Sequence, residues 1–160
     1  MGIEIERKFL VINDGWRSQA SGVFYCQGYV AKTEGVTVRI RVIGNQGFVT
    51  LKGKTKNYSR PEFEYPIPLE DAQEMMRLWC DYVVEKNRYR IPMGNLVWEV
   101  DEFKGLNEGL VIAEVELEHP DQPVPLPDWV GTEVSHQSQY FNSSLAQSPY
   151  REWRGRSEQG

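Results

Sequence analysis

The sequence is poor in the residues that carry covalent or imidazole-based catalysis. It contains two cysteines and two histidines among its 160 residues. The separation of Cys26 and Cys80 along the sequence matches no metal-ligand spacing. Both histidines, His119 and His136, lie outside the charged segments described below, so no Ser–His–Asp or Cys–His arrangement is indicated. Two cysteines in a chain without a secretory signal are expected to stay reduced.

Long apolar runs and an excess of basic charge are also missing. No segment approaches the roughly 18 apolar residues that a membrane-spanning helix needs, and the N-terminal MGIEIERKFLV is charged where a signal peptide is apolar. Glu6 stands where a myristoylation signal has Ser or Thr. Acidic residues outnumber basic ones, 23 to 18, so a general nucleic-acid binder is not expected. We predict a cytoplasmic protein with no membrane or nucleic-acid partner, and a homodimer is left open.

What is present is the composition of one globular domain. Hydrophobic residues make up 40% and charged residues 26% of the chain, and this length can bury a single sizeable core. We predict one domain over residues 1–150 and a C-terminal tail over residues 151–160, with the sequence REWRGRSEQG.

Eight segments alternate polar and apolar residues with the period of two that is typical of β-strands. Turn residues such as Gly44-Asn45 and Gly94-Asn95 stand between them. One helix is expected from about Leu69 to Cys80, and a second from Val134 towards Ala146. The predicted strands are Ile3–Val11, Val23–Val30, Val36–Ile43, Phe48–Lys54, Glu62–Ile67, Val83–Ile91, Val97–Phe103 and Val111–Leu117.

The charges of each predicted strand share one face, because side chains two apart point the same way. In the first strand, for example, Glu4, Glu6 and Lys8 share one face, and Ile3, Ile5 and Phe9 share the other. The carboxylates on the charged faces are Glu4, Glu6, Glu62, Glu64, Glu99, Asp101, Glu114, Glu116 and Glu118. The cations are Lys8, Arg39, Arg41, Lys52, Lys54, Lys86, Arg88 and Arg90.

Two arrangements fit this pattern. In the ordinary one, the charged faces are wet and the barrel or sheet has an apolar interior, which would suit a hydrophobic ligand. In the inverted one, the charges line the lumen of a closed barrel and the apolar faces lie outside, under the helices. Paired like charges on one face repel, and a ligand of opposite sign would compensate for this repulsion. Hard carboxylate oxygens favour Mg²⁺ or Mn²⁺, and Arg and Lys suit phosphoryl oxygens.

The segment Glu4-Ile-Glu6-Arg-Lys8 resembles the ExExK signature of the CYTH superfamily, the triphosphate tunnel metalloenzymes, in its short bacterial form. The resemblance continues in order along nearly the whole chain. It includes QGY at 27–29, VRIR at 38–41, TLKG at 50–53, EFEYPIP at 62–68, KNRYR at 86–90, WEVDEF at 98–103 and AEVEL at 113–117. The resemblance implies an eight-stranded antiparallel closed β-barrel, a tunnel with a charged lumen and a few helices packed outside.

The resemblance also implies roles for individual residues. Tyr29 would be a proton acceptor and Lys86 a catalytic donor to phosphate, while Glu62 and Glu64 would orient the cations or a water. The implied metal ligands, for Mg²⁺ or Mn²⁺, are Glu4, Glu6, Glu114 and Glu116, with Asp101 completing the shell or holding a second ion. The implied substrate-binding residues are Lys8, Arg39, Arg41, Lys52, Lys54, Glu62, Glu64 and Arg88, together with Lys86.

One segment departs from the family pattern. Family members often carry a carboxylate and an arginine near the C-terminus, where this chain reads EVSHQSQYFN, with the neutral Gln137 and Gln139 at the corresponding places. We predict metal-dependent hydrolysis of a triphosphate, with inorganic tripolyphosphate as the first choice. Adenylate cyclase, thiamine triphosphatase and nucleoside triphosphatase activities stay open, as does a non-catalytic binder of polyphosphate or nucleotide.

Overall fold

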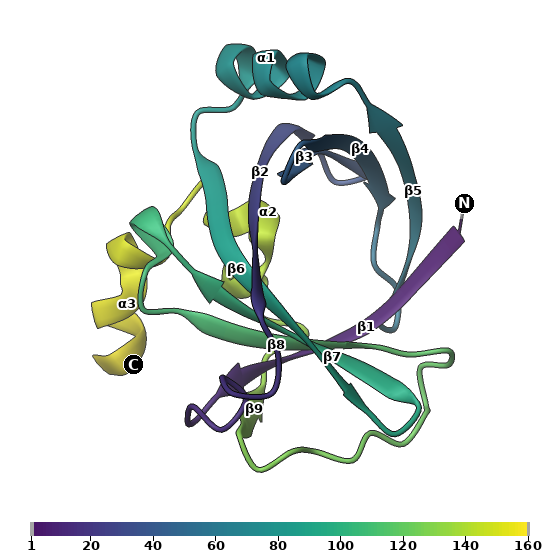
Figure 1. Cartoon of the computed structure of the whole chain (residues 1–160), viewed down its shortest axis with the longest axis vertical. Coiled ribbons are helices and arrows are strands. Elements are labelled where there is room, and N and C mark those ends of the chain that lie inside the picture. Colours follow the sequence, from purple (N-terminus) through teal and green to yellow (C-terminus); the bar gives the residue numbers. More distant parts are fainter. Residues whose placement is uncertain (1, 160) are drawn as a thin grey trace.

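A closed antiparallel barrel dominates the computed structural model, which describes the backbone of residues 2–159 and the side chains of residues 2–155 (Figure 1). The order of neighbours around the barrel is β5-β4-β3-β2-β6-β7-β8-β1, and β1 pairs back onto β5. The strands are β1 (Gly2–Val11), β2 (Gly22–Lys32), β3 (Val36–Ile43), β4 (Gln46–Gly53), β5 (Ser59–Ile67), β6 (Val83–Met93), β7 (Leu96–Phe103) and β8 (Val111–Glu116). The eight strands and the closed barrel predicted from the sequence are confirmed.

The long strand β1 closes the barrel, because its two halves have different neighbours. Its first half pairs with β5, from Gly2 opposite Glu62 to Ile5 opposite Ser59. Its second half pairs with β8, where Glu6 lies opposite Glu116. A short strand that the sequence did not predict, β9 (Val130–Glu133), adds to the outer edge of β1.

The barrel is inverted, as the second of the two arrangements predicts. The side chains of Lys8, Arg41, Lys86, Arg88 and Asp101 are buried inside it. The apolar side chains of the same strands point outward and pack under the surrounding segments. The largest outer cluster includes Phe9, Trp98, Val100, Ala113 and Val115, covered by Trp16 and Trp129 from the connecting loops.

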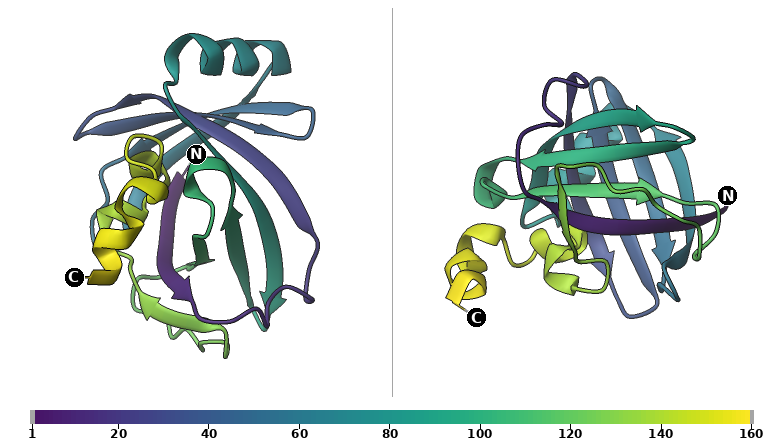
Figure 2. Two further views of the ribbon diagram at one scale, coloured as in Figure 1. Left: turned by 90° about the vertical axis from the view of Figure 1, so that its left-hand side faces the viewer. Right: turned by 90° about the horizontal axis from the view of Figure 1, so that it is seen from below.

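Helix α1 (Leu69–Trp79) lies outside the barrel across the strands β2 to β4 (Figures 1 and 2). It buries Ala72 and Met76 against Ile40, which confirms the predicted helix. Trp79, the last residue of the helix, is 57% exposed. No helix of residues 2–159 is long and apolar enough to cross a membrane.

The C-terminal part fills one end of the lumen rather than forming the predicted continuous helix from Val134 to Ala146. It forms a 3₁₀ turn, η2 (Ser138–Tyr140), and the short helix α2 (Asn142–Leu145). Tyr140, Leu145 and Ala146 pack against Val84, Phe103 and Ile112, which share the inward face of their strands with the charged residues. The tunnel therefore has an apolar plug at this end, and its charged part lies beyond the plug.

The remaining helical segments lie beside this plug. A 3₁₀ turn, η1 (Gly105–Asn107), connects β7 and β8, and residues 150–159, which include most of the predicted tail, form helix α3 (Tyr150–Gln159). Trp153 of α3 packs edge-on against Tyr140, with ring centroids 5.4 Å apart. The end of the chain is thus attached to the plug through an aromatic contact.

Candidate active site in the tunnel

A charged cavity of about 220 Å³ lies inside the barrel. Every strand from β1 to β8 contributes to its lining, because the inward face of each strand carries at least one charged or polar side chain. Most predicted site residues line it, namely Glu4, Glu6, Lys8, Tyr29, Arg39, Arg41, Lys52, Glu62, Glu64, Lys86, Arg88, Glu114 and Glu116.

Two predicted site residues lie elsewhere. Lys54 follows the last residue of β4 and is exposed, so it does not belong to the lining. Asp101 is fully buried behind Lys86 and Arg88, with 0% of its surface exposed. The neutral Gln137 and Gln139 are exposed and lie outside the lining, so they do not replace charges within the cavity.

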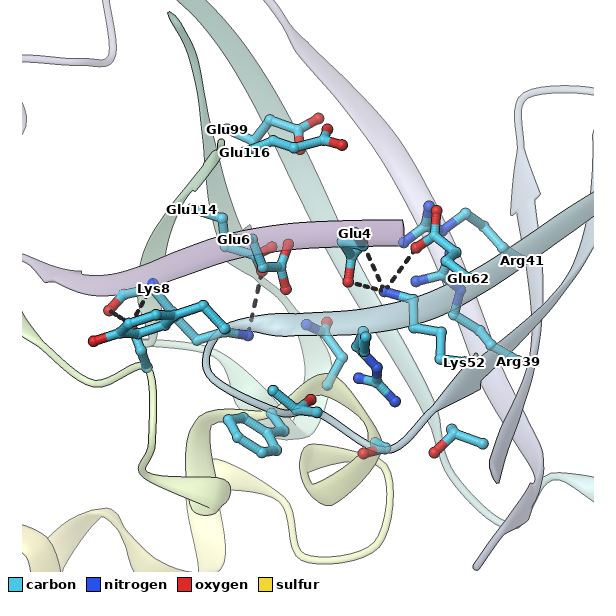
Figure 3. A pocket seen from close by; sticks show the side chains of 18 of the residues that line it. Glu4, Glu6, Lys8, Arg39, Arg41, Lys52, Glu62, Glu99, Glu114 and Glu116 are labelled. Carbon is cyan, nitrogen blue, oxygen red and sulfur yellow. Dashed lines mark hydrogen bonds and ion pairs between the residues drawn. The ribbon is translucent and has the colours of Figure 1, made fainter. Parts of the chain in front are cut away.

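Along β1, the carboxylates of Glu4, Glu6 and Glu114 lie between two lysines, Lys8 and Lys52 (Figure 3). Lys52 Nζ lies 3.1 Å from Glu4 Oε2 and 3.3 Å from Glu62 Oε2. Lys8 Nζ lies 3.3 Å from Glu114 Oε1. Although burial opposes the charge of Glu4, Lys52 lowers the pKa of this carboxyl to about 2. Glu4 is therefore an anion at neutral pH.

Glu6 has the opposite electrostatic setting. Its burial and the neighbouring charges of Glu114 and Glu4 raise its pKa well above the usual range. A cation that entered between these side chains would remove this repulsion. Their hard oxygen atoms are the ligands that Mg²⁺ and Mn²⁺ prefer. Among the described residues, no three carboxylate, imidazole or thiol groups form a ready-made metal site, and Lys8 and Lys52 contact the carboxylates in this conformation.

The arginines of β3 face the carboxylates from the other side of the cavity. Arg39 Nη2 donates to Thr50 Oγ1 at 3.1 Å and to Glu64 Oε2 at 3.2 Å. The buried Nε of Arg39 has no hydrogen-bond partner among the described residues. An unsatisfied buried donor of this kind is costly, and an anionic ligand would satisfy it.

Arg41 is the least neutralised of these cations. Burial and the charges of Arg39 and Arg88 lower its pKa to about 9. Its Nε donates to the neutral Oε1 of Gln27 at 2.8 Å. Burial and the repulsion between neighbouring cations both favour a ligand that carries several negative charges.

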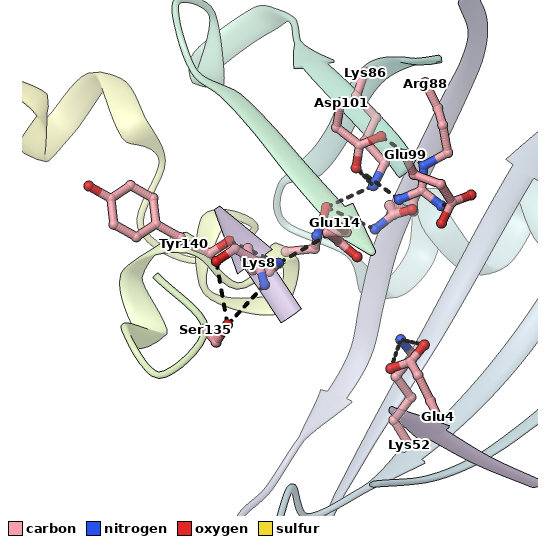
Figure 4. Close-up of polar contacts among 12 residues, drawn as sticks. Glu4, Lys8, Lys52, Lys86, Arg88, Glu99, Asp101, Glu114, Ser135 and Tyr140 are labelled. Atoms are coloured by element: carbon pink, nitrogen blue, oxygen red, sulfur yellow. Dashed lines mark hydrogen bonds and ion pairs between the residues drawn. The ribbon is translucent and has the colours of Figure 1, made fainter. Parts of the chain in front are cut away.

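A buried ion-pair cluster joins Asp101 to Lys86 and Arg88 (Figure 4). Asp101 Oδ2 accepts hydrogen bonds from Lys86 Nζ and from Arg88 Nη2, both at 2.8 Å, and Oδ1 accepts one from Arg88 Nε at 2.7 Å. Burial and the charge of Arg88 lower the pKa of Lys86 to about 7. Both oxygens of Asp101 are therefore engaged by cations, and the cluster keeps one excess positive charge when Lys86 is protonated.

Tyr29 lines the cavity between the two sides. Its hydroxyl accepts a hydrogen bond from Gln27 Nε2 at 3.3 Å, and the same Nε2 atom lies 3.3 Å from Asn142 Oδ1. Asn142 Oδ1 also accepts a hydrogen bond from Lys86 Nζ at 3.1 Å. The plug helix α2 thus contacts Lys86 directly and is linked to Tyr29 through Gln27.

Sequence reasoning missed the neutral members of the site. Gln27 shares an inward face with Tyr25 and Tyr29, so alternation could have identified it, whereas Asn142 lies in a short helix without a periodic signal. A group of rings on one side of the lining was also missed: Tyr58, His136 and Phe141. Tyr58 and His136 stack with centroids 4.7 Å apart, and Tyr58 has a positive φ of 69°.

This tunnel defines the class of the protein: a closed β-barrel whose lumen is lined by carboxylates, lysines and arginines. Residues 2–150 match the model of the CYTH domain, and the chain belongs to this family. Family membership implies a divalent metal ion. The carboxylate oxygens around Glu6 are suitable ligands for such an ion.

Relatives of known sequence and structure agree with this assignment. An inorganic triphosphatase of Acetivibrio thermocellus is 44% identical over 155 residues, which cover 96% of this chain and 99% of the relative. The crystal structure of the inorganic triphosphatase NE1496 is 32% identical, covers 89% of this chain and 96% of that one, and superposes with a TM-score of 0.63. A third structure is the putative adenylyl cyclase HpAC1 from Hippeastrum, described as having a dominant triphosphatase activity. It is 15% identical, covers 74% of this chain and 81% of that one, and superposes with a TM-score of 0.54. At this identity, the similarity shows a shared fold alone.

Proposed function

We propose that this protein hydrolyses inorganic tripolyphosphate with the help of a divalent metal ion, Mg²⁺ or Mn²⁺. The observation that carries the proposal is the buried guanidinium pair inside a closed tunnel: Arg39, whose buried Nε has no hydrogen-bond partner among the described residues, and Arg41, which no carboxylate contacts within ion-pair distance there. The similarity to an inorganic triphosphatase over nearly the whole chain supports the same reaction. Hydrolysis would convert tripolyphosphate and one water into pyrophosphate and orthophosphate.

We assign the metal to the carboxylate side of the tunnel, at Glu4, Glu6, Glu114 and Glu116. Their oxygen donors and the raised pKa of Glu6 fit a divalent cation. The ion would act as a Lewis acid on the phosphoryl oxygens. We assign Asp101 to another task, because its two oxygens hold Lys86 and Arg88 in place.

The cations would bind the phosphates and stabilise the charge that spreads over the transferred phosphoryl group, which is mainly electrostatic catalysis. Glu62 and Glu64 would keep Lys52 and Arg39 in position. Tyr29 would accept the proton of the attacking water, and Lys86 would donate a hydrogen bond to phosphate. The residues that we assign to phosphate binding are Lys8, Arg39, Arg41, Lys52, Lys86 and Arg88.

The size of the cavity favours the inorganic substrate over an organic triphosphate. Its volume of about 220 Å³ is smaller than the roughly 300–1,000 Å³ of sites for drug-sized ligands. The plug also occupies one end of the lumen, so a bulky group could extend only from the other side.

One observation favours a second candidate, hydrolysis of an organic triphosphate. Tyr58, His136 and Phe141 line the cavity together, and aromatic rings can stack on a nucleobase or a thiazolium ring. However, Tyr58 and His136 already stack on each other, so one face of each ring is used.

A substrate panel tests both candidates. Tripolyphosphate, ATP and thiamine triphosphate are incubated with Mg²⁺ or Mn²⁺, and the products are identified by ion chromatography. We expect the highest kcat/KM for tripolyphosphate, with equal amounts of pyrophosphate and orthophosphate. Thermal stabilisation by tripolyphosphate without phosphate release would indicate a binder instead of an enzyme. We also propose a cytoplasmic location and a small-molecule triphosphate as the partner. Light scattering, which measures the mass of the particle in solution, distinguishes a monomer from a homodimer.

A further inference from the structure

The cations of the tunnel fall into two groups by the charge of their partners. Most of them contact a carboxylate within ion-pair distance in the described part of the chain. These pairs are Lys8–Glu114, Lys52–Glu4, Arg39–Glu64, Lys86–Asp101 and Arg88–Asp101. Each of these carboxylates offsets part of the positive charge that a phosphate would meet.

Arg41 and Arg60 differ, because residues 2–155 place no carboxylate within ion-pair distance of either guanidinium group. Arg60 is only half-buried and donates to the backbone oxygen of Gly53 at 3.0 Å, so the buried cation of the two is Arg41. It is 9% exposed, and its charge is opposed by burial and by Arg39 and Arg88. Two neutral side chains hold it instead. Gln27, which is fully buried, accepts a hydrogen bond from Arg41 Nε at 2.8 Å. The guanidinium carbon of Arg41 also lies 5.1 Å from the centroid of the Tyr25 ring.

Tyr25 contacts a second guanidinium in the same way. The guanidinium carbon of Arg88 lies 5.1 Å from the same ring centroid. The negative face of an aromatic ring attracts cations without carrying a net charge. One ring therefore stabilises two arginines that repel each other. Because the ring has no net charge, it does not neutralise the positive charge that the arginines present to a ligand.

We propose that Gln27 and Tyr25 are positioning residues that hold Arg41 by uncharged contacts and so reserve its positive charge for the triphosphate. This inference rests on the proposed function, because the anionic partner that Arg41 does not have within the protein would be the triphosphate substrate. Neither Gln27 nor Tyr25 belongs to the cavity lining, so both act through Arg41 rather than on the substrate.

The variant Gln27→Glu tests the inference, because it gives Arg41 a carboxylate of nearly the same shape; it also removes the two long hydrogen bonds, both 3.3 Å, from Gln27 Nε2 to Tyr29 and Asn142. In the metal-free protein we expect a rise in Tm of about 2–4 °C, since repulsion around Arg41 is relieved. In calorimetric titrations with tripolyphosphate in excess EDTA, we expect binding to weaken by about tenfold or more. Stability and affinity thus change in opposite directions. The exposed Gln73→Glu carries the same charge change outside the tunnel and serves as the matched control for both measurements.

The ring of Tyr25 is tested by a pair of variants. Tyr25→Leu removes the aromatic face and is expected to weaken tripolyphosphate binding by about threefold to tenfold. Tyr25→Phe keeps the face and is expected to restore most of the affinity. This pair also decides the question if Gln27→Glu does not fold.

The outcomes that overturn the inference are distinct from a failure of the proposed function. Wild-type affinity in both Gln27→Glu and Tyr25→Leu would show that Arg41 needs neither contact. A lower Tm together with weaker binding in Gln27→Glu would show an ordinary structural role, and equally weak binding in Tyr25→Phe and Tyr25→Leu would exclude the ring contact. If the wild-type protein itself did not bind tripolyphosphate, the proposed function would fail, and the inference with it.

Discussion

The ammonium group of Lys86 lies 2.8 Å from Oδ2 of Asp101, and both side chains are removed from solvent. Because Arg88 contacts both oxygens of the same carboxylate, Asp101 balances two cations at once. The arrangement stabilises Lys86 and Arg88 in the interior and directs them towards the cavity. The geometry therefore favours a positioning role for Asp101 over the metal-ligating role that the resemblance implied.

Replacement of Asp101 by Asn separates these two roles. Loss of a buried counter-charge is strongly destabilising, so we expect Asp101→Asn to lower the free energy of unfolding of the metal-free protein by about 3 kcal/mol. Urea unfolding in excess EDTA measures this change, with the exposed Asp128→Asn as a control. Unchanged stability combined with weaker Mg²⁺ binding would instead make Asp101 a metal ligand.

Substitution of the β3 arginines is expected to affect binding and stability differently. Arg41→Met removes a buried cation that no carboxylate neutralises, so the metal-free protein should be as stable as wild type or more stable. Arg39→Met also leaves Glu64 without its cation, which offsets the gain. Both variants should lose tripolyphosphate affinity in calorimetric titrations. If Arg41→Met unfolded the protein as a large core deletion does, by several kcal/mol, the arginine would be structural.

Metal dependence is tested by Glu116→Ala. Glu116 is exposed to the cavity, and no cation contacts it within ion-pair distance among the described residues, so its removal should change stability by less than about 0.5 kcal/mol. Phosphate release from tripolyphosphate should nevertheless fall to a small fraction of the wild-type rate. Glu118→Ala, two residues further along and exposed, is the matched control. Full wild-type activity in excess chelator would refute the metal requirement.

The role of Tyr29 is tested by Tyr29→Phe, which removes only the hydroxyl group. If the hydroxyl accepts the proton of the attacking water, kcat should fall by about 10²-fold or more, the alkaline part of the pH–rate profile should flatten, and KM should stay nearly the same. Steady-state kinetics across pH measure these effects. A kcat that is unchanged at every pH would assign Tyr29 to packing.

The contact between Arg7 and Glu133 predicts a pH effect on stability. Arg7 donates from Nε to Glu133 Oε2 at 2.9 Å and from Nη2 to Oε1 at 2.6 Å, and these hydrogen bonds lower the pKa of the Glu133 carboxyl. Because the folded pKa lies below the unfolded one, this stabilisation is present above the unfolded pKa and is lost as the pH falls through the folded pKa.

Between pH 7 and pH 3, wild type should therefore lose about 1 kcal/mol more stability than Glu133→Gln, a small value because the pair is partly solvated. Urea unfolding of both proteins at several pH values measures the difference. Parallel pH curves would show that the ion pair contributes nothing to folding.

Alternation of charge was sufficient to predict the strands, because each strand carries its pattern locally, whereas the closed barrel was implied by the family resemblance. The same pattern placed Lys54 in the site, but β4 ends at Gly53 and the alternation continues for one residue beyond the strand. The inward direction of the charges was not a local property. It followed from the pairing of like charges across the whole set, and the buried Lys86 and Asp101 confirm it.

The C-terminal region was predicted poorly for physical reasons. The four residues of β9 are too few for a period to be visible. The following segment is rich in Ser and contains Asn142, and both residue types are weak helix formers, so packing of Tyr140 and Leu145 into the lumen decides its shape. The contacts of Asn142 with Gln27 and Lys86 depend on this packing, and no sequence pattern contains that information.

The closure of the barrel by β1 has a consequence for how the chain folds. Strand β1 precedes the other strands in the chain, but its partners are β5 and β8, so Glu6 meets Glu116 only after all eight strands of the barrel have been made. Contacts between residues so far apart in sequence slow folding. Until β8 arrives, the growing chain also presents unpaired strand edges to other molecules. Early termination of synthesis before β8 should therefore produce an aggregating fragment rather than a smaller tunnel.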